Sequence, residues 1–271
     1  MNLLETYVGG WREAADAVIA LGADLTDDEW AAPTDCPGWT VKDVYAHLAH
    51  LETELSHTTQ NAASGSGDAG GNELVSTYTA DGVATRAGHS PAELVAELAV
   101  AVSTRAELLA DLPDDPDLPA PVTPGGIPWS WDTLLRNRSI DMWVHEQDIR
   151  RATGRHGGLA SAGAQVATMT FSFAMPYVLG KRVRPPADTI VRWDVTGAIP
   201  VDLVVQIGAD GRATTLDLID VLDQPSTTLS MNSETFAVLA AGRRGPDQVD
   251  VTITGDHELG VATLSAMGVT P

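Results

Sequence analysis

Residues 36–48 read CPGWTVKDVYAHL and combine a strong helix-start signal with a histidine two turns into the helix. Thr40 is a preferred N-cap residue, and Asp43 follows at the third helical position in a pattern close to the capping box. Trp39 precedes the cap and can pack across it. We therefore expect a helix that starts just after Thr40 and holds His47 at a well-defined position.

Further along this helix, polar side chains share one face. His47, His50 and Glu54 recur at helical spacing, so two imidazoles and a carboxylate point the same way. A lone helical histidine is more often a hydrogen-bonded core or surface residue than a ligand, so this stripe alone predicts no site. We expect neither His50 nor Glu54 to bind a metal directly.

The composition indicates a globular protein. The chain has 271 residues, of which 44% are hydrophobic, enough for a substantial core and suited to two domains. Its formal charge is −21, which disfavours polyanionic partners such as nucleic acid or an anionic membrane. We therefore expect neither a nucleic-acid partner nor a membrane partner.

Cysteine content and the N-terminus point to the cytoplasm. Cys36 is the single cysteine, which excludes an intrachain disulfide framework and a cysteine-rich zinc site. The first residues, MNLLE, lack the basic and apolar regions of a signal peptide, and no apolar run approaches the length of a spanning helix. We expect a cytoplasmic protein, whose oligomeric state the sequence leaves open.

The first two thirds of the chain have the pattern of helices. Amphipathic spacing and capping signals predict helical segments at residues 3–22, 41–57, 73–87, 90–111, 131–152 and 158–180, with a short turn at 26–30. Residues 61–72 are rich in Gly, Ser, Ala and Asn and predict a flexible loop. Residues 112–128 hold six prolines and predict a surface connection. These segments include four principal helices, and no strand pattern occurs among them, which indicates a helical bundle.

The pattern changes after a basic, proline-containing seam at residues 181–186. Short β-rich runs follow at residues 189–196, 201–207, 214–218, 226–231 and 249–253, with helices at 233–241 and 256–267. Gly208 and Gly211 lie in a short turn typical of a hairpin. We therefore predict an α+β protein with a helical bundle at residues 1–182 and a small α+β domain at residues 187–271.

The helix predicted at residues 131–152 carries a second pair of candidate ligands. Asp141 and His145 are four residues apart on one face, with Cβ atoms roughly 5–6 Å apart. Bundles assemble metal sites from facing helices, so His47 could complete a three-ligand site with one position open, which suits zinc and, less tightly, iron, manganese or cobalt. Asp148, one turn further, could orient a ring N–H or be solvated. The alternative is a surface pair beside a core histidine.

Both segments resemble one protein family. Residues 36–40 (CPGWT) with His47, followed by residues 141–148 (DMWVHEQD), resemble the mycothiol-dependent maleylpyruvate isomerase family of actinobacterial proteins. The resemblance implies a DinB-like four-helix bundle that holds a divalent metal, usually zinc, followed by a small α/β sandwich resembling sterol carrier protein 2. Residues 241–243 (AGR) and 254–256 (TGD) match the family's closing pattern, so the resemblance covers nearly the whole chain.

The resemblance carries functional roles to four positions of this chain. His47 matches the family's first-helix ligand and His145 its last ligand, while Asp141 stands where the isomerase itself has a glutamate. The shorter aspartate side chain would draw the metal nearer the helix or weaken the bond. Arg243 matches, through a short Gly-Arg motif, the catalytic arginine that the family places near the active site.

The resemblance also implies a reaction. A coordinated thiol loses its proton at neutral pH and becomes a nucleophile. In the isomerase, the sulfur of mycothiol adds to the cis double bond of maleylpyruvate, the bond rotates, and elimination gives fumarylpyruvate. In the wider family the thiolate would attack an electrophile and stay attached. We therefore expect a zinc-dependent isomerase or S-transferase, with mycothiol as cosubstrate and a small electrophile as substrate.

Other reactive side chains near these segments have simpler interpretations. Cys36 sits in a Pro-Gly turn without an activating base evident in the sequence, so we expect it to pack in the core. We expect most of the arginines near the predicted ligands to be exposed and to counter the acidic surface: Arg136, Arg138, Arg150, Arg151 and Arg155.

A second hypothesis is a non-catalytic binding protein. In that case the bundle keeps a structural metal or none, and an apolar groove of the small domain carries a hydrophobic ligand. Bound zinc that depends on His47 and His145 would favour the enzyme, whereas a folded metal-free protein would favour the binding protein.

Overall fold

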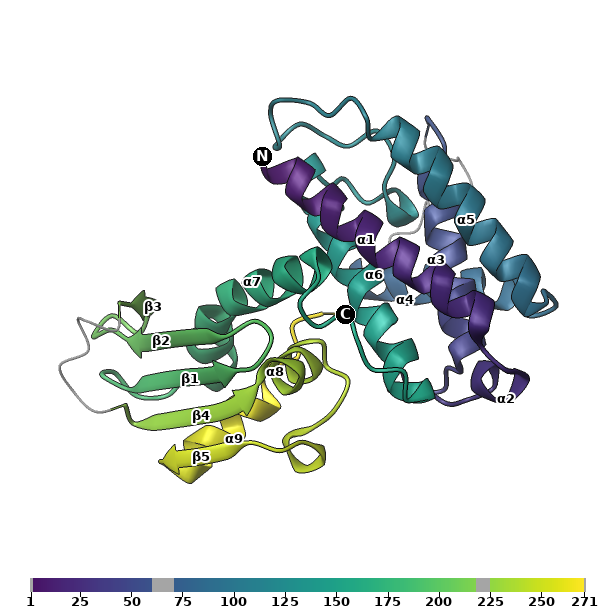
Figure 1. Ribbon diagram of the computed structural model, residues 1–271. Coiled ribbons are helices and arrows are strands. Elements are labelled where there is room, and N and C mark those ends of the chain that lie inside the picture. The colour runs from purple at the N-terminus through teal and green to yellow at the C-terminus, as the bar shows by residue number, and fades with distance from the viewer. Residues whose placement is uncertain (1, 60–70, 218–224, 271) are drawn as a thin grey trace. The chain divides into compact units, whose positions relative to one another are not determined.

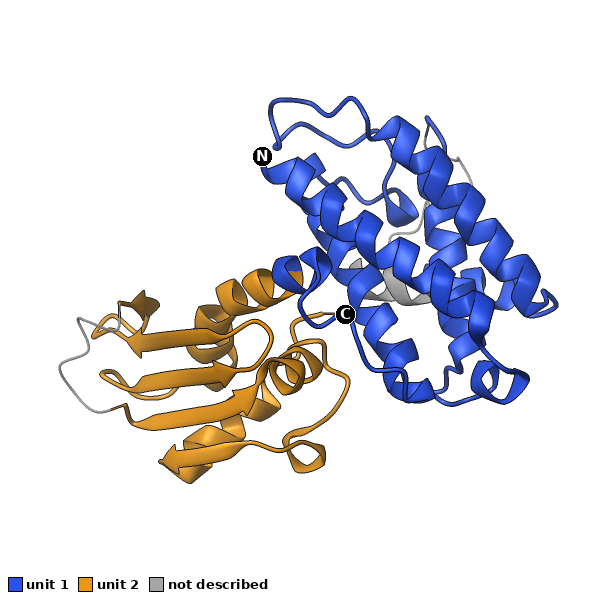
Figure 2. Cartoon of the chain, in the orientation of Figure 1, with its two compact units in different colours: residues 1–166 blue, residues 167–271 orange. Residues whose placement is uncertain are grey.

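The computed structural model describes residues 2–59, 71–217 and 225–270. These residues form two compact units, Met1–Val166 and Ala167–Pro271 (Figure 2). The loop predicted at residues 61–72 lies outside the described residues, apart from its last two positions. The predicted domain limits, 1–182 and 187–271, stay a prediction.

Helices build the first unit (Figure 1). They are α1 (Leu3–Asp24), α2 (Asp27–Trp30), α3 (Val41–Leu55), α4 (Gly71–Thr85), α5 (Pro91–Leu108) and α6 (Trp131–Thr153), and α7 (Ala162–Tyr177) begins in this unit. α1 packs on α5 and α6, while α3 packs on α4, α5 and α6. The predicted helical bundle is therefore present, with helix ends within a few residues of the predicted ones.

Capping side chains define where several of these helices begin. The Thr40 hydroxyl accepts a hydrogen bond from the Asp43 backbone N–H at 3.3 Å, and the Asp43 carboxylate accepts one from the Thr40 N–H at 2.8 Å. Asn2, Thr26 and Ser90 form the same reciprocal box with a glutamate three residues later. These boxes satisfy N–H groups that a helix leaves without partners, so the local sequence determines each start.

A buried ion cluster joins three helices inside the apolar core of the first unit. Glu52 of α3 accepts hydrogen bonds from Arg105 of α5 at 2.6 Å and from Arg138 of α6 at 2.7 Å. All three side chains are at most 3% exposed. The apolar core around them includes Trp11, Tyr45, Leu48, Leu98, Leu135 and Met142.

Two segments differ from the sequence-based expectation. Residues 112–128 are not wholly a surface connection, because Val122 is buried against Leu55 and Leu134. Helix α7 begins at residue 162 instead of 158, because Gly157 and Gly158 have φ angles of 155° and 73°, which are incompatible with a right-handed helix.

The second unit contains a five-stranded sheet in the order β3-β2-β1-β4-β5. Its elements after α7 are the π-type turn η2 (Val178–Val183), β1 (Ile190–Thr196), β2 (Val201–Ile207), β3 (Ala213–Leu216), β4 (Thr227–Asn232), α8 (Ser233–Ala240), the 3-10 turn η4 (Pro246–Gln248), β5 (Thr252–Gly255) and α9 (His257–Ser265). β1 and β4 are parallel, whereas the other neighbouring pairs are antiparallel. The predicted α+β class is therefore confirmed.

The core of the second unit lies between the sheet and its helices. α8 packs on β1 and β4, and α9 packs on β4 and β5. Trp193, Leu229, Phe236 and Met267 are fully buried there. β5 occupies residues 252–255 and not the predicted 249–253, because only residues 252–255 pair with residues 227–230 of β4.

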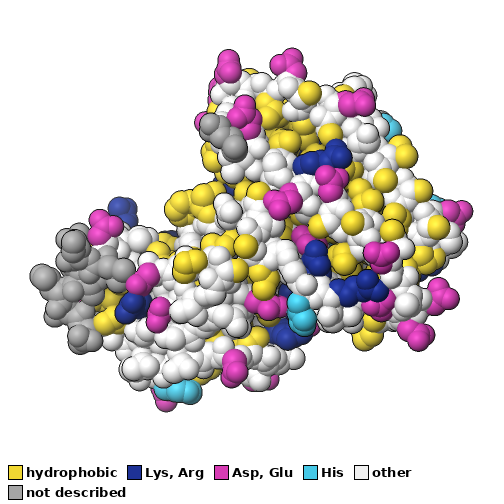
Figure 3. Space-filling model, viewed as in Figure 1, with side chains coloured by type: hydrophobic (Ala, Val, Ile, Leu, Met, Phe, Trp, Pro, Cys, Tyr) yellow, Lys and Arg dark blue, Asp and Glu magenta, His cyan; other side chains and the backbone are white. Residues whose placement is uncertain are grey.

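The surface is predominantly acidic, as the net charge requires. Figure 3 shows Asp and Glu side chains spread over the visible face, with fewer Lys and Arg side chains. Among the described residues, no helix has both the length and the apolar character needed to cross a membrane.

Candidate metal centre

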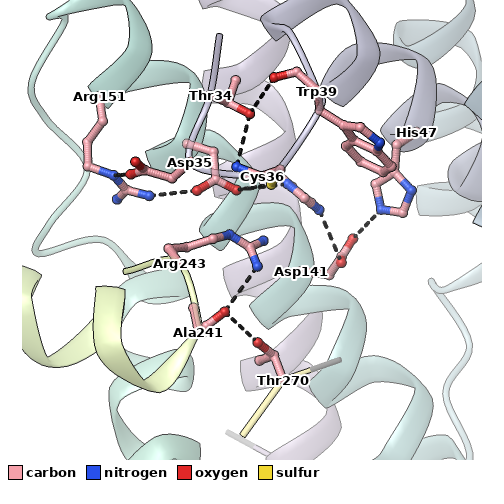
Figure 4. A network of polar contacts seen from close by, with 12 residues as sticks. Thr34, Asp35, Cys36, Trp39, His47, Asp141, Arg151, Ala241, Arg243 and Thr270 are labelled. Carbon is pink, nitrogen blue, oxygen red and sulfur yellow. Dashed lines mark hydrogen bonds and ion pairs between the residues drawn. The ribbon is translucent and has the colours of Figure 1, made fainter. Parts of the chain in front are cut away.

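Helices α3 and α6 bring the three predicted ligands together. His47 Nε2 lies 3.5 Å from Asp141 Oδ2, and His145 Nε2 lies 3.6 Å from Asp141 Oδ1. Figure 4 shows His47 and Asp141 pointing toward one another. One donor atom from each of the three side chains lies within 4.8 Å of the other two. Both imidazoles are 5% exposed, whereas the Asp141 side chain is 31% exposed, so the cluster reaches solvent at the carboxylate.

His47 is buried in an environment that favours a neutral imidazole. Both of its ring nitrogens are buried, and neither has a hydrogen-bond partner among the described residues. Burial lowers the pKa of His47 to about 4, against the opposing effect of Asp141. The ring is therefore neutral at pH 7, which is the form that binds a metal.

His145 is held much more firmly than His47. Its Nδ1 lies 3.0 Å from Asp148 Oδ2. Burial would lower the pKa of His145, but Asp141, Asp148 and Cys36 outweigh it and raise the pKa to about 9. A proton therefore competes with a metal for His145 when the centre is empty of metal.

Asp141 remains ionised although it is flanked by protein on most sides. Burial would raise its pKa, but Arg138 and the two histidines hold the pKa well below its usual range. Arg138 Nη1 donates a hydrogen bond to Asp141 Oδ2 at 2.7 Å while its other nitrogens bind Glu52. The buried ion cluster of the core therefore extends to the candidate centre.

A second group of possible donors shares His145. Cys36, His145 and Asp148 also have donor atoms within 4.8 Å of one another. Asp148 Oδ1 accepts a hydrogen bond from Arg151 Nη2 at 2.6 Å, and Oδ2 accepts one from the Cys36 thiol at 3.3 Å. Both oxygens of Asp148 are therefore engaged, and Oδ2 links His145 to Cys36.

The turn before α3 places an aromatic ring beside the two imidazoles. Gly38 has a φ angle of 80°, and the Thr34 hydroxyl donates a hydrogen bond to the Trp39 carbonyl at 3.0 Å. The centroid of Trp39 lies 5.2 Å from that of His47 and 6.2 Å from that of His145. Sequence reasoning had used Trp39 only at the helix cap and had missed its place at the centre.

The arginines near the ligands are paired, which corrects the expectation that most of them are exposed and merely counter the surface charge. Arg138 is 3% exposed and binds Glu52 and Asp141. The remaining pairs are Arg136 with Asp132, Arg150 with Glu146, Arg151 with Asp35 and Asp148, and Arg155 with Glu29. Carboxylates one helical turn away or on neighbouring segments supply these partners. Spacing along α6 could have predicted the pairs within that helix.

His50 is in neither of the two donor groups among the described residues. Its Nδ1 faces Arg86 at 3.2 Å and its ring packs against Tyr78 at a centroid distance of 4.7 Å. Glu54 is likewise not part of either donor group among the described residues. The other predicted site residue, Arg243, belongs to the second unit, where its Nη1 donates to the Ala241 carbonyl at 3.0 Å. The catalytic role of Arg243 stays a prediction.

The sequence was compared with protein families once this geometry was established. Residues 11–150 match the family described as the mycothiol maleylpyruvate isomerase N-terminal domain, which spans slightly more than half of the chain. The matched segment contains His47, Asp141 and His145.

Several relatives cover most of the chain. Uncharacterized proteins from two strains of Mycobacterium tuberculosis are each 28% identical over 265 residues, covering 92% of this chain and 90% of the relative. Another uncharacterized protein from Mycobacterium tuberculosis is 27% identical over 194 residues, covering 66% of this chain and 91% of the relative.

Two solved structures have a similar fold. The crystal structure of the mycothiol-dependent maleylpyruvate isomerase has a TM-score of 0.56 at 15% identity, covering 94% of this chain and 95% of that chain. The crystal structure of a histidine-to-alanine mutant of that isomerase has a TM-score of 0.55 with the same identity and coverage. At this identity the similarity concerns the fold alone.

Proposed function

Because this chain belongs to the mycothiol maleylpyruvate isomerase family through its N-terminal domain, we propose that it is an enzyme that activates a low-molecular-weight thiol with a divalent metal. The proposed metal is zinc and the proposed thiol is mycothiol. The reaction is S-transfer to a small electrophile, or thiol-assisted cis-trans isomerisation of one such as maleylpyruvate.

The convergence of His47, Asp141 and His145 is the observation that carries this proposal. Two imidazoles and a carboxylate form a donor set that catalytic zinc sites use, with a further position left for water or substrate. The buried nitrogens of His47 have no hydrogen-bond partner among the described residues, which is costly for polar atoms unless a ligand or water satisfies them. The donor set fits a bound cation, and such a cation would satisfy His47 Nε2, the ring nitrogen that faces Asp141.

When bound, the metal would supply a position at which a thiol loses its proton at neutral pH. The protein's own residues prepare this position. Asp141 brings negative charge to the centre, and Arg138 holds one of its oxygens at 2.7 Å. Trp39 lies beside both imidazoles and would limit the access of water from that side of the centre. A drier environment strengthens the electrostatic interactions within it.

The proposed chemistry begins with the thiolate sulfur as nucleophile. In S-transfer, the sulfur forms a bond to an electrophilic carbon and remains attached, while the displaced electron pair departs with a leaving group or, where the carbon belongs to a conjugated double bond, takes up a proton. In isomerisation, the sulfur adds to a conjugated cis double bond, the resulting single bond rotates, and the sulfur leaves again to restore the double bond in the trans form. Both reactions use the same activated thiol and differ only in whether the C–S bond is broken afterwards.

The ion pairs of the first unit indicate what charge the electrophilic substrate should carry. Every arginine of the unit pairs with a carboxylate of the same unit. A dianion such as maleylpyruvate would therefore find no unpaired arginine among the described residues of this unit, and the metal would supply much of its positive counter-charge. Arg243 of the second unit remains the catalytic arginine that we propose from the resemblance. An uncharged electrophile would need no such counter-charge, so the pairing favours S-transfer to an electrophile of low charge.

The proposal also includes the fold of the second unit and the cellular location. We propose that residues 187–271 form a small domain resembling sterol carrier protein 2, after a DinB-like bundle at residues 1–182. The five-stranded sheet with helices α8 and α9 packed on it supports this. A thiol cosubstrate requires reducing conditions, which supports the cytoplasm as the proposed location.

Metal analysis of the purified protein tests the function directly. We expect close to one zinc ion per wild-type chain, and its loss from His47→Ala and His145→Ala with the helical circular dichroism signal retained. His50→Ala is the matched control, because His50 lies one turn from His47 on α3 but outside the ligand group, and this variant should keep its zinc. A folded wild-type protein that binds no zinc, iron, manganese or cobalt would overturn the proposal and favour a non-catalytic binding protein.

Two substrate assays then separate the reactions. Zinc-loaded protein and mycothiol are incubated with maleylpyruvate in one assay and with an uncharged chromogenic electrophile in the other. We expect a thioether product in the second assay that depends on His47. Fumarylpyruvate formation without any thioether would instead identify the isomerase.

A further inference from the structure

Asp148 is a fully buried carboxylate beside the candidate centre, with 0% exposure. It lies one helical turn after His145 on α6 and outside the proposed ligand set. Arg151 Nη2 donates to Asp148 Oδ1 at 2.6 Å, while Asp148 Oδ2 lies 3.0 Å from His145 Nδ1 and 3.3 Å from the Cys36 sulfur. A buried carboxylate with donors on both oxygens is held in one orientation.

This arrangement determines which nitrogen of His145 keeps its proton when the ring is neutral, as it must be to bind a metal. A carboxylate paired with an arginine acts as a hydrogen-bond acceptor, so the nitrogen 3.0 Å from Asp148 Oδ2 must be the donor. In a neutral imidazole with a proton on Nδ1, the lone pair lies on Nε2. Nε2 is the nitrogen that faces Asp141, at 3.6 Å from Oδ1.

We infer that Asp148 is the positioning residue that fixes the ring of His145 with its Nε2 lone pair directed to the centre formed with His47 and Asp141. The inference rests on the proposed metal-dependent function and adds a residue to it. Carboxylates bound to the distal nitrogen of a metal-ligating histidine orient the ring and increase its basicity as a ligand.

The two histidines differ in what holds their rings in place. Neither nitrogen of His47 has a hydrogen-bond partner among the described residues, so its ring is oriented by packing against Trp39 and His145 and by the longer approach of Nε2 to Asp141 at 3.5 Å. His145 is therefore the anchored ligand, and His47 is the one that can adjust to the cation. Loss of the hydrogen bond between Asp148 and His145 should therefore lower the metal affinity, although Asp148 is not itself in the proposed ligand set.

Arg151 provides a matched control for the role of Asp148. Arg151 binds Asp148 through Nη2. It also binds Asp35 through Nε at 2.8 Å, and Figure 4 shows this second pair. Asp35→Asn weakens an ion pair of the same arginine but leaves the Asp148–His145 hydrogen bond in place. A purely structural role for this cluster would make the two substitutions equivalent.

The test measures zinc affinity and the protonation pattern of His145 in full-length protein. Zinc is titrated against a chromogenic chelator for wild type, Asp148→Asn and Asp35→Asn. We expect Asp148→Asn to weaken zinc binding about 10–100-fold, and Asp35→Asn to remain near wild type. Long-range nitrogen–proton NMR spectra of zinc-loaded, 15N-histidine-labelled protein should show His145 protonated at Nδ1 and bound at Nε2.

The outcomes distinguish a failure of the role of Asp148 from a failure of the proposed metal-dependent function. Zinc binding by wild type that Asp148→Asn leaves unchanged, or that Asp35→Asn weakens equally, would overturn the role of Asp148 alone. A wild-type spectrum with His145 bound through Nδ1 would overturn it even if Asp148→Asn failed to fold. Wild-type protein that binds no zinc would overturn the proposed function, and with it this inference.

Discussion

At the scale of single residues, the candidate centre depends on side chains that hold one another. Asp141 meets His47 through Oδ2 and His145 through Oδ1, and it is itself held by Arg138 at 2.7 Å. Three side chains therefore contact the negatively charged carboxylate of Asp141. Since the resemblance places a glutamate at this position in the isomerase, the length and the charge of the side chain can be tested separately.

Substitution of Asp141 should distinguish charge from reach. We expect Asp141→Asn to weaken zinc binding more than about 100-fold, because losing a ligand costs more than losing an outer partner of a ligand. Asp141→Glu retains the charge with a longer reach and should retain zinc. Chelator competition at pH 7.5, with circular dichroism as the folding control, measures both. Equal zinc affinity in Asp141→Asn and wild type would remove Asp141 from the ligand set.

At the scale of elements, helix α6 carries most of the candidate centre. Two of the ligands and their partners are three or four residues apart on it, as in Arg138 with Asp141 and His145 with Asp148. This spacing puts each pair on one face of the helix. α6 must then pack closely on the bundle to bring its ligands to α3, and it packs on α1 at a glycine. There a Cβ atom on Gly10 would lie 2.6 Å from the Ser139 hydroxyl and 3.2 Å from the Gly163 backbone.

Adjacent glycines of α1 provide a matched test of this packing. Gly10→Ala should destabilise the protein by about 1–3 kcal/mol, because the new methyl group overpacks the contact with α6. Gly9→Ala should stabilise it by roughly 0.5–1 kcal/mol, because a Cβ atom there meets nothing within 4 Å and alanine favours the helix. Urea denaturation of both variants gives the free energies of unfolding. If Gly10→Ala were as stable as Gly9→Ala, the close approach of α1 and α6 would be wrong.

At the scale of the whole molecule, a net charge of −21 coexists with a few buried positive charges that organise the first unit. Arg105 and Arg138 are both buried beside Glu52, which joins α3, α5 and α6. Burial would raise the pKa of Glu52, but the two arginines lower it overall. The stability of this unit should therefore depend on the ionisation of one interior carboxylate.

The sign of the pH dependence follows from the lowered pKa. Glu52 contributes its full stabilisation above its unfolded pKa of about 4.3 and loses it as the pH falls through its lower folded pKa. Glu52→Gln should cost about 3–5 kcal/mol at pH 7, because it leaves the buried Arg105 without its carboxylate and Arg138 with Asp141 alone. The difference between wild type and variant should shrink as the pH is lowered from 5 toward 3, as measured by urea denaturation.

An exposed ion pair provides the control for Glu52. Arg12 and Asp16 pair at 2.9 Å on α1, with side chains 43% and 54% exposed. Asp16→Asn should change the free energy of unfolding by less than about 0.5 kcal/mol, because solvent screens exposed pairs. A constant difference between wild type and Glu52→Gln across the whole pH range would contradict the role of the buried carboxylate.

The sequence by itself determined the local features of this protein. Helix starts followed from capping residues such as Thr40 and Ser90, because a cap is satisfied by atoms within a few residues. The change from helices to strands near residue 186 followed from a change in hydrophobic period. The pairing of Asp141 with His145 followed from helical spacing, and His47 was placed with them by reasoning about facing helices.

Only the tertiary structure decided which side chains meet across helices. Trp39 beside both imidazoles, Cys36 against Asp148, and Arg138 between Glu52 and Asp141 all join residues that are far apart in the chain. The boundaries of α7 and β5 also depended on glycine geometry and strand pairing that no hydrophobic pattern records. Capping and periodicity are short-range effects, whereas the partners of a buried polar group are set by packing, so the ligands could be predicted and most of what holds them could not.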